Sequence, residues 1–142
     1  LSALQMVGMI SLRDKNIHEI SSGECQMVLL ARALAQETPI ILLDEPNAHL
    51  DMENQRNMLQ LLHKLVSQTH LSVIAVVHTP DIAYWFSDYV CLLQQGQIYA
   101  LGTPQEVLTE QNLAYIYQLP IRTFELSSCY QAAVPEYLLH QK

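Results

Sequence analysis

The sequence predicts an α/β fold in which a mostly parallel sheet is flanked by helices, and three segments support this class. Residues 40–43 are all apolar and run directly into two carboxylates, as is typical of a parallel strand buried on both faces. Residues 71–77 form a second apolar, β-branched run that favours a buried strand. Between them, residues 52–68 carry a broad apolar stripe at helical spacing. This order of strand, helix and strand is typical of a parallel sheet covered by helices.

The chain before the first strand is expected to be helical. Apolar residues at positions 1, 4, 6, 7 and 10 predict an amphipathic helix over residues 1–10, and a polar connector follows at residues 11–19. A second helix is expected over residues 22–36. Thr38-Pro39 should end it, because the residue before a proline avoids the helical region. The residues of this helix predicted to pack inward are Val28, Leu29, Ala31, Ala33 and Leu34.

The helix over residues 52–68 should be capped by Asp51. Beyond the second strand, a short helix is predicted at residues 81–86, and strands at 89–93 and 97–100 should form a hairpin around Gln95-Gly96. Further helices are expected at residues 104–108, opened by Pro104, and from the cap Thr109 to residue 117. Short strands and an irregular tail are equally compatible with residues 119–142.

Composition limits the function classes. The 142 residues suit one domain by length, and 7 basic against 14 acidic residues give a net charge of −7. This charge argues against nucleic acid and anionic lipid as direct partners. No apolar run approaches the roughly 18 residues of a membrane helix, and no signal peptide opens the chain. Cys25, Cys91 and Cys129 are predicted to be buried free thiols in a reducing cytoplasm, with a disulfide or metal site as the alternative.

Two segments carry candidate chemistry. Ser21, Ser22 and Gly23 place small side chains and backbone N–H groups at the start of a helix, which is a suitable site for an anion. The alternative is an ordinary N-capped helix with Ser21 or Ser22 as the cap. Asp44 and Glu45 follow a buried strand, at the sheet edge where open α/β folds bind their ligands. The alternative is that they only end the strand and begin a turn.

Four segments resemble the motifs of ATP-binding-cassette (ABC) ATPases, in the family's order. Residues 20–26, Ile-Ser-Ser-Gly-Glu-Cys-Gln, are similar to the signature motif, and residues 40–46, Ile-Ile-Leu-Leu-Asp-Glu-Pro, to the Walker B strand. Residues 47–51 resemble the D-loop, and residues 76–78, Val-Val-His, the switch-histidine strand. The spacing also fits the family, with 21 positions from Gly23 to Asp44 and 33 from Glu45 to His78.

The resemblance implies ATP and Mg²⁺ as cofactors and gives each motif residue a role. Glu45 would polarise the water that attacks the γ-phosphate, Asp44 would hold Mg²⁺, and His78 would contact the γ-phosphate. The resemblance also implies residues that bind the nucleotide. In the signature-like segment, where they would act on a nucleotide held by another subunit, these are Ser21, Ser22, Gly23, Glu24 and Gln26; in the D-loop-like segment it is Asp51. Three positions depart from the family pattern: Ser22 replaces a usual glycine, Met27 a usual arginine, and Thr79 an acid found in many relatives. The histidines at 18, 49, 63, 70 and 140 are expected to be surface or packing residues.

The resemblance implies the C-terminal part of a P-loop (RecA-like) nucleotide-binding domain. Residues 1–36 would be the end of the helical subdomain with the signature helix, residues 37–118 the core, and residues 119–142 a tail. The four glycines, at 8, 23, 96 and 102, leave no place for the phosphate loop Gly-x-x-x-x-Gly-Lys-Ser/Thr. The 142 residues alone are therefore expected to be inactive and to bind ATP weakly or not at all.

Residues 92–109 resemble the run that follows the switch region in transporter ATPases, and residues 110–121 resemble importers of iron-siderophore, haem and vitamin B12 type. The implied assembly is a homodimer of ATPase subunits beneath two membrane permease subunits, fed by a substrate-binding protein. Such a subunit would be peripheral on the cytoplasmic face of the inner membrane, without nucleic-acid partners. The alternatives are a non-transport ABC ATPase of repair, translation or regulation, and an interaction fragment without activity.

Overall fold

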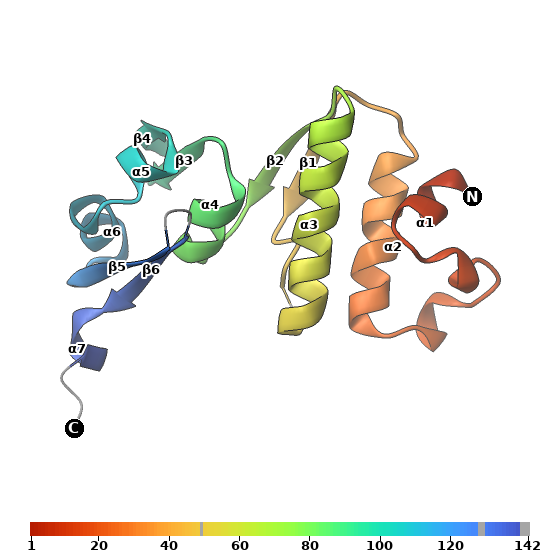
Figure 1. Ribbon diagram of the computed structural model, residues 1–142, viewed down its shortest axis with the longest axis horizontal. Helices are drawn as coiled ribbons and strands as arrows, with labels where there is room; N and C mark the ends of the chain where they lie inside the picture. Colours follow the sequence, from red (N-terminus) through yellow and green to blue (C-terminus); the bar gives the residue numbers. More distant parts are fainter. Residues whose placement is uncertain (49, 128–129, 140–142) are drawn as a thin grey trace. The chain divides into compact units, whose positions relative to one another are not determined.

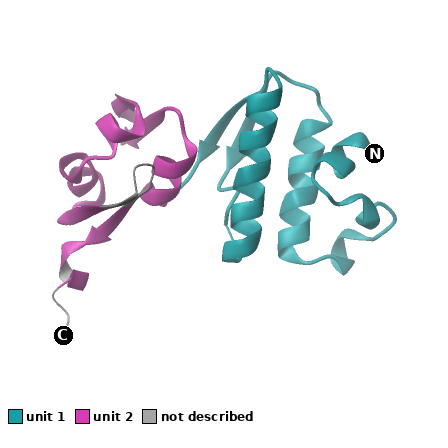
Figure 2. Ribbon diagram, in the orientation of Figure 1, with its two compact units in different colours: residues 1–77 teal, residues 78–142 magenta. Residues whose placement is uncertain are grey.

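The computed structural model describes residues 1–48, 50–127 and 130–139, and the chain divides into two compact units. Unit 1 is Leu1–Val77 and unit 2 is His78–Lys142 (Figure 2). This boundary differs from the predicted boundaries after residues 36 and 118. The predicted division into three segments therefore stays a prediction. Among the helices of the described residues, none is long and apolar enough to cross a membrane.

Unit 1 is a two-stranded parallel sheet with helices (Figure 1). Strand β1 pairs with β2 in register from Ile40↔Ser72 to Asp44↔Val76, as predicted for these two segments. Because the strands are parallel, their carboxyl ends lie at the same edge. The elements in chain order are α1 (Ser2–Met6), the 3₁₀ helices η1 (Ile10–Leu12) and η2 (Ile17–Glu19), α2 (Ser22–Leu34), β1 (Ile40–Asp44), α3 (Met52–Gln68) and β2 (Ser72–Val76).

The first helix is shorter than predicted. It ends at Met6, and Gly8 adopts a φ of 72°, a conformation that favours glycine and breaks the helical path. The polar connector also contains a helical turn, η2, which is capped by Asn16 and Glu19 in a reciprocal pair of hydrogen bonds. The prediction of one helix over residues 1–10 is therefore wrong in length.

The prediction that residues 40–43 are buried on both faces is wrong. Ile41 is 4% exposed, but Leu42 is 73% exposed, and the strand alternates between a covered and an open face. Strand β2 alternates in the same way. The physical reason is that the described helices of unit 1 cover one face of this small sheet. Its other face, the open sheet face, carries Ile40, Leu42, Ile74 and Val76.

The inward face of α2 also differs from the prediction. Of the five residues expected to pack inward, only Ala31 is buried, and Leu29 is 37% exposed. The buried residues, Met27, Leu30 and Ala31, follow the three- and four-residue spacing of one helical face. In α3 the predicted stripe is confirmed, since Met58, Leu59 and Leu62 form its buried centre.

Unit 2 contains two antiparallel hairpins and four helices among its described residues. The predicted hairpin is confirmed, and both residues of its turn, Gln95 (φ 49°) and Gly96 (φ 76°), have the positive φ that tight hairpins require. Of the two alternatives for the C-terminal segment, short strands are correct. The elements are α4 (Pro80–Phe86), β3 (Val90–Gln94), β4 (Gln97–Gly102), α5 (Pro104–Val107), α6 (Glu110–Tyr117), β5 (Ile121–Ser127), β6 (Tyr130–Pro135) and α7 (Glu136–Leu139).

The cysteine prediction is confirmed in one respect and wrong in another. Cys25 and Cys91 are free thiols, as expected. Cys91 is exposed rather than buried, because β3 turns this side of the hairpin to the surface, and Cys25 is half-buried. Cys129 lies outside the described residues.

Candidate functional site

The turn that opens α2 is closed by a reciprocal capping box. The Glu24 backbone N–H donates to Ser21 Oγ at 3.2 Å, and the Ser21 backbone N–H donates to Glu24 Oε2 at 2.8 Å. Ser21 is therefore the cap, which decides between the two serines. The first hydrogen bond of the helix is the one that the Cys25 N–H donates to the Ser21 carbonyl at 2.9 Å. The N–H groups of Ser22 and Gly23 precede it and therefore have no partner within the helix's own series of hydrogen bonds. These two donors lie at the positive end of a 13-residue helix.

The capping box keeps Glu24 ionised. The hydrogen bond from the Ser21 backbone, then that from its side chain, hold the pKa of the Glu24 carboxyl below its ordinary value of 4.5, and Lys15 adds to the shift. An ionised carboxylate only accepts hydrogen bonds. Glu24 therefore holds the turn closed at neutral pH.

The capping box predicts an acid-dependent contribution to stability. Because the folded-state pKa of Glu24 is lowered, its contribution is present above the unfolded-state pKa and is lost as pH falls through the folded-state value. In the complete protein, Glu24→Gln should lower the melting temperature at pH 7, and the difference from wild type should shrink below about pH 4.5. Melting curves between pH 7 and pH 3 would measure this. Glu53→Gln, which removes a charge from the first turn of α3, is the control; a constant difference for Glu24→Gln at all pH values would contradict the prediction.

The end of β1 is conformationally strained at Glu45. Asp44 is the last residue of the strand, and Glu45 has a φ of 46°, which is uncommon for any residue other than glycine and more so before a proline. Two backbone hydrogen bonds hold it there: the Glu45 N–H donates to Val76 O at 3.0 Å, and its carbonyl accepts from the Ala48 N–H at 3.0 Å. Such strain costs of order 1–3 kcal/mol and gathers at functional sites.

The start of α3 contacts the turn that opens α2. Asp51 caps α3, as predicted, by accepting from the Asn54 N–H at 2.8 Å and from Asn54 Nδ2 at 3.0 Å. A Cβ added at Gly23 would lie 3.3 Å from Asn54 Nδ2 and 3.6 Å from Leu50 Cδ2. Gly23 therefore permits close packing between the two helix starts. In Figure 1 both helices begin at the end of unit 1 where β1 finishes.

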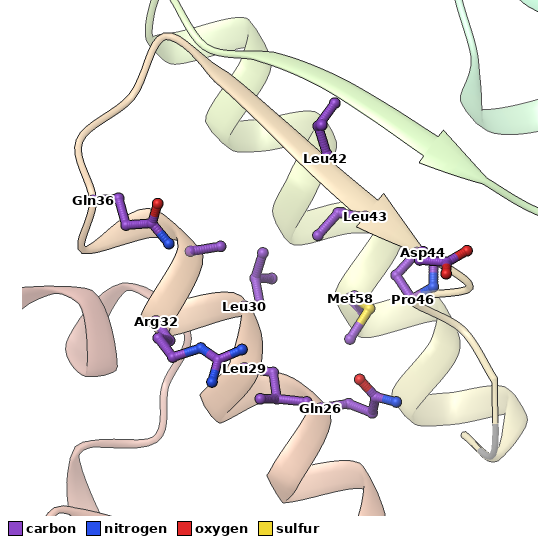
Figure 3. Close-up of a pocket in the computed structure, with 11 residues that line it drawn as sticks. Gln26, Leu29, Leu30, Arg32, Gln36, Leu42, Leu43, Asp44, Pro46 and Met58 are labelled. Atoms are coloured by element: carbon purple, nitrogen blue, oxygen red, sulfur yellow. The ribbon is translucent and has the colours of Figure 1, made fainter.

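A cavity of about 290 Å³ lies between α2 and β1 (Figure 3). Gln26 and Asp44, both predicted site residues, contribute to its wall, with Met58 of α3 beside them. Arg32 and Gln36 line it further along α2. The structure thus brings Gln26 to the same cavity as the end of β1. It also places Gly23 close to Asn54, which donates hydrogen bonds to Asp51.

His78 opens unit 2 and is held by a distant side chain. Its carbonyl accepts a hydrogen bond of 2.9 Å from the Tyr117 hydroxyl, 39 residues further along the chain. Three other histidines, at positions 18, 63 and 70, are exposed, as expected of surface residues, and His49 and His140 lie outside the described residues.

The sequence did not single out Asn54 or Tyr117. Asn54 stands three residues after Asp51, the position at which a side-chain cap accepts from the backbone, so the spacing Asp-x-x-Asn is the local signal that was available. Tyr117 had no such signal, because its partner is remote in sequence.

Comparison with known proteins identifies the class. The sequence profile of the ABC transporter family matches residues 1–48. A solved structure of a transporter described as metal-chelate type, in an inward-facing conformation, superimposes with a TM-score of 0.86 at 29% identity, covering 96% of this chain and 56% of that one. The chain belongs to the ABC transporter ATPase family, and its fold is the α/β fold of that family's nucleotide-binding domains.

Curated relatives include ATP-binding proteins of importers. The petrobactin import ATP-binding protein FpuD of Bacillus anthracis is 36% identical over 118 residues, which is 83% of this chain and 43% of the relative. The cobalamin import ATP-binding protein BtuD of Halobacterium salinarum is 35% identical over 111 residues, 78% of this chain and 28% of the relative. The chain thus spans less than half the length of these two relatives.

Proposed function

We propose that the complete protein is the ATP-binding and ATP-hydrolysing subunit of an ABC importer, and that its cargo is a metal chelate or a cobalamin-like molecule. The observation that carries the proposal is the strained Glu45 directly after Asp44, in a unit that also contains the capped start of α2. Similarity to ATP-binding proteins of petrobactin and cobalamin importers supports this cargo class.

In this proposal Glu45 is the general base. Its carboxylate follows directly after the carboxyl end of a parallel strand, where it would accept a proton from the water that attacks the γ-phosphate. General-base catalysis of this kind contributes roughly 10²–10⁴-fold to rate. The two backbone hydrogen bonds at Glu45 keep this position rigid, which proton transfer over a short distance requires.

Asp44 fits a role in holding Mg²⁺. The described residues contain no group of three or more His, Cys, Asp or Glu arranged to hold a metal. Mg²⁺ does not need such a group, because it is usually bound by one or two carboxylates together with substrate phosphates and water. Asp44 offers an exposed carboxylate at the end of β1, and the ion would neutralise charge on the phosphates.

The turn before α2 would bind the γ-phosphate of a nucleotide held by a second copy of the subunit. The N–H groups of Ser22 and Gly23, without partners in the helical ladder, are the donors for this anion. Ser21 and Glu24 hold the turn in shape. The Glu24 carboxylate is ionised, so it accepts hydrogen bonds and does not donate one. Beyond the turn, Gln26 would contact the nucleotide from the cavity wall.

Asp51 and His78 are the two remaining residues to which the proposal gives a role. Asp51 fixes the start of α3, against which Gly23 packs through Asn54, so it would couple the two segments that meet the partner subunit. His78 would contact the γ-phosphate and hold the attacking water. The proposed assembly is a homodimer beneath two membrane permease subunits at the cytoplasmic face of the inner membrane, served by a substrate-binding protein.

Uptake assays would test the proposed function in cells. Cells that lack the gene should lose uptake of one class of labelled compound, tested with ferric siderophores, haem and cobalamin in parallel. The wild-type gene should restore uptake, and a gene carrying Glu45→Gln should not. Undiminished uptake of every compound in the deleted cells would contradict the importer role.

A further inference from the structure

Tyr117 links the end of α6 to His78, the residue that follows β2 and Val77 in the sequence. It is the last residue of α6, and Gln118, with a φ of 55°, ends the helix directly after it. The Tyr117 hydroxyl donates to the His78 carbonyl at 2.9 Å. Both residues belong to unit 2, so the contact lies within one compact unit.

The His78 carbonyl lies outside the hydrogen-bond ladder of the helix that follows it. The first carbonyl that α4 uses is that of Thr79, which accepts from the Ala83 N–H at 3.2 Å. Pro80, at the first position of α4, has no N–H to donate. The phenol of Tyr117 therefore supplies this carbonyl with a donor from a different element.

The bond acts on the peptide unit between His78 and Thr79. Pro80 restricts Thr79 to an extended conformation, and Thr79 has φ −103° and ψ 112°. The orientation of the peptide between His78 and Thr79 then depends on ψ of His78. Holding the carbonyl restrains that ψ, and with it the backbone from which the imidazole extends.

We propose that Tyr117 is a positioning residue for His78: by holding the His78 carbonyl, it restrains the backbone that carries the imidazole. The inference rests on the proposed function, which places His78 at the phosphate. In this proposal Tyr117 acts through His78 and does not touch the nucleotide. Its contribution is orientation, and small misplacements of catalytic groups are expensive in rate.

The hydroxyl of Tyr117 keeps its proton under working conditions. Partial burial, and then the nearby Asp81 carboxylate, raise the pKa of Tyr117 above its ordinary value of 10.0. The phenol therefore remains a donor throughout the neutral range, and the hydrogen bond to His78 does not depend on pH there.

Tyr117→Phe in the complete protein tests the role, because it removes the hydroxyl and keeps the ring. ATP turnover should fall about three- to tenfold, as expected from the net worth of one hydrogen bond, while KM for ATP stays unchanged. The matched control is Tyr115→Phe on the same helix, whose ring stacks on Tyr99 with centroids 4.7 Å apart and needs no hydroxyl to do so. Tyr115→Phe should turn over ATP like wild type.

A double-mutant cycle with His78→Ala separates positioning from general stability. Single-turnover rates, which remain measurable when turnover is slow, should show no further loss when Tyr117→Phe is added to His78→Ala. A further loss of the same size would identify a merely structural residue and overturn the inference. If His78→Ala is inactive and Tyr117→Phe is fully active, the inference alone fails. If His78→Ala keeps normal turnover, the proposed role of His78 fails, and the inference with it.

Discussion

Glu45→Gln in the complete protein is expected to lower ATP turnover by at least about 100-fold while leaving ATP binding intact. Glutamine keeps the size and hydrogen-bonding capacity of the side chain and removes its basicity. Because the backbone at Glu45 is held by Val76 and Ala48, the strained geometry should survive the substitution. The variant should therefore bind ATP and stop before hydrolysis.

Steady-state hydrolysis and equilibrium ATP binding would measure the two halves of this result. The chain offers a matched control in Glu37, an exposed glutamate that also has a positive φ, 52°, and precedes β1 rather than following it. Glu37→Gln should hydrolyse ATP at the wild-type rate. Turnover of Glu45→Gln within twofold of wild type would show that Glu45 is not the base.

Mixing two inactive variants should restore activity if the site is shared between subunits. Gly23→Asp places a negative charge at the helix start that is proposed to meet the partner's phosphate, and should block hydrolysis. In a heterodimer with Glu45→Gln, the Gly23→Asp subunit keeps its own Glu45 and meets the intact turn of its partner. One complete site forms, so an equal mixture should reach about a quarter of the wild-type rate.

The contact between Gly23 and Asn54 requires a control for folding. A Cβ at Gly23 approaches Asn54 Nδ2 to 3.3 Å, so any side chain there makes the neighbour shift slightly. Gly23→Ala adds this Cβ without the charge, and should keep much more activity than Gly23→Asp. If heterodimers form but hydrolyse ATP no faster than either parent variant, the prediction that each site is shared between subunits and works independently of the other site is wrong.

Local signals predicted local structure well. The cap at Ser21 or Ser22, the helix cap Asp51 and the tight turn at Gln95-Gly96 all depend on residues within a few positions of each other. Each is confirmed, and the structure selects Ser21 of the two serines. The strands β1 and β2 and their neighbouring helices follow from apolar patterns of the same short range.

Features that depend on remote segments were not predictable in this way. Leu42 looked buried because its strand is wholly apolar, yet burial depends on which elements cover each face of the sheet. The bond from Tyr117 to His78 spans 39 residues. The positive φ of Glu45 was also not predictable from the sequence, because a glutamate before a proline suggests an ordinary extended residue.

The open sheet face has a consequence for how copies of this chain behave in concentrated solution. Each sheet among the described residues has two strands, so every described strand has an unpaired edge, and in unit 1 that edge borders the apolar Ile40, Leu42, Ile74 and Val76. Open edges beside apolar surface favour strand addition between molecules. The net charge of −7 opposes such contacts by mutual repulsion, which vanishes near the isoelectric point of about 5.2 and weakens with added salt. Dilute, alkaline, low-salt buffer is therefore the condition that keeps copies of the 142 residues apart.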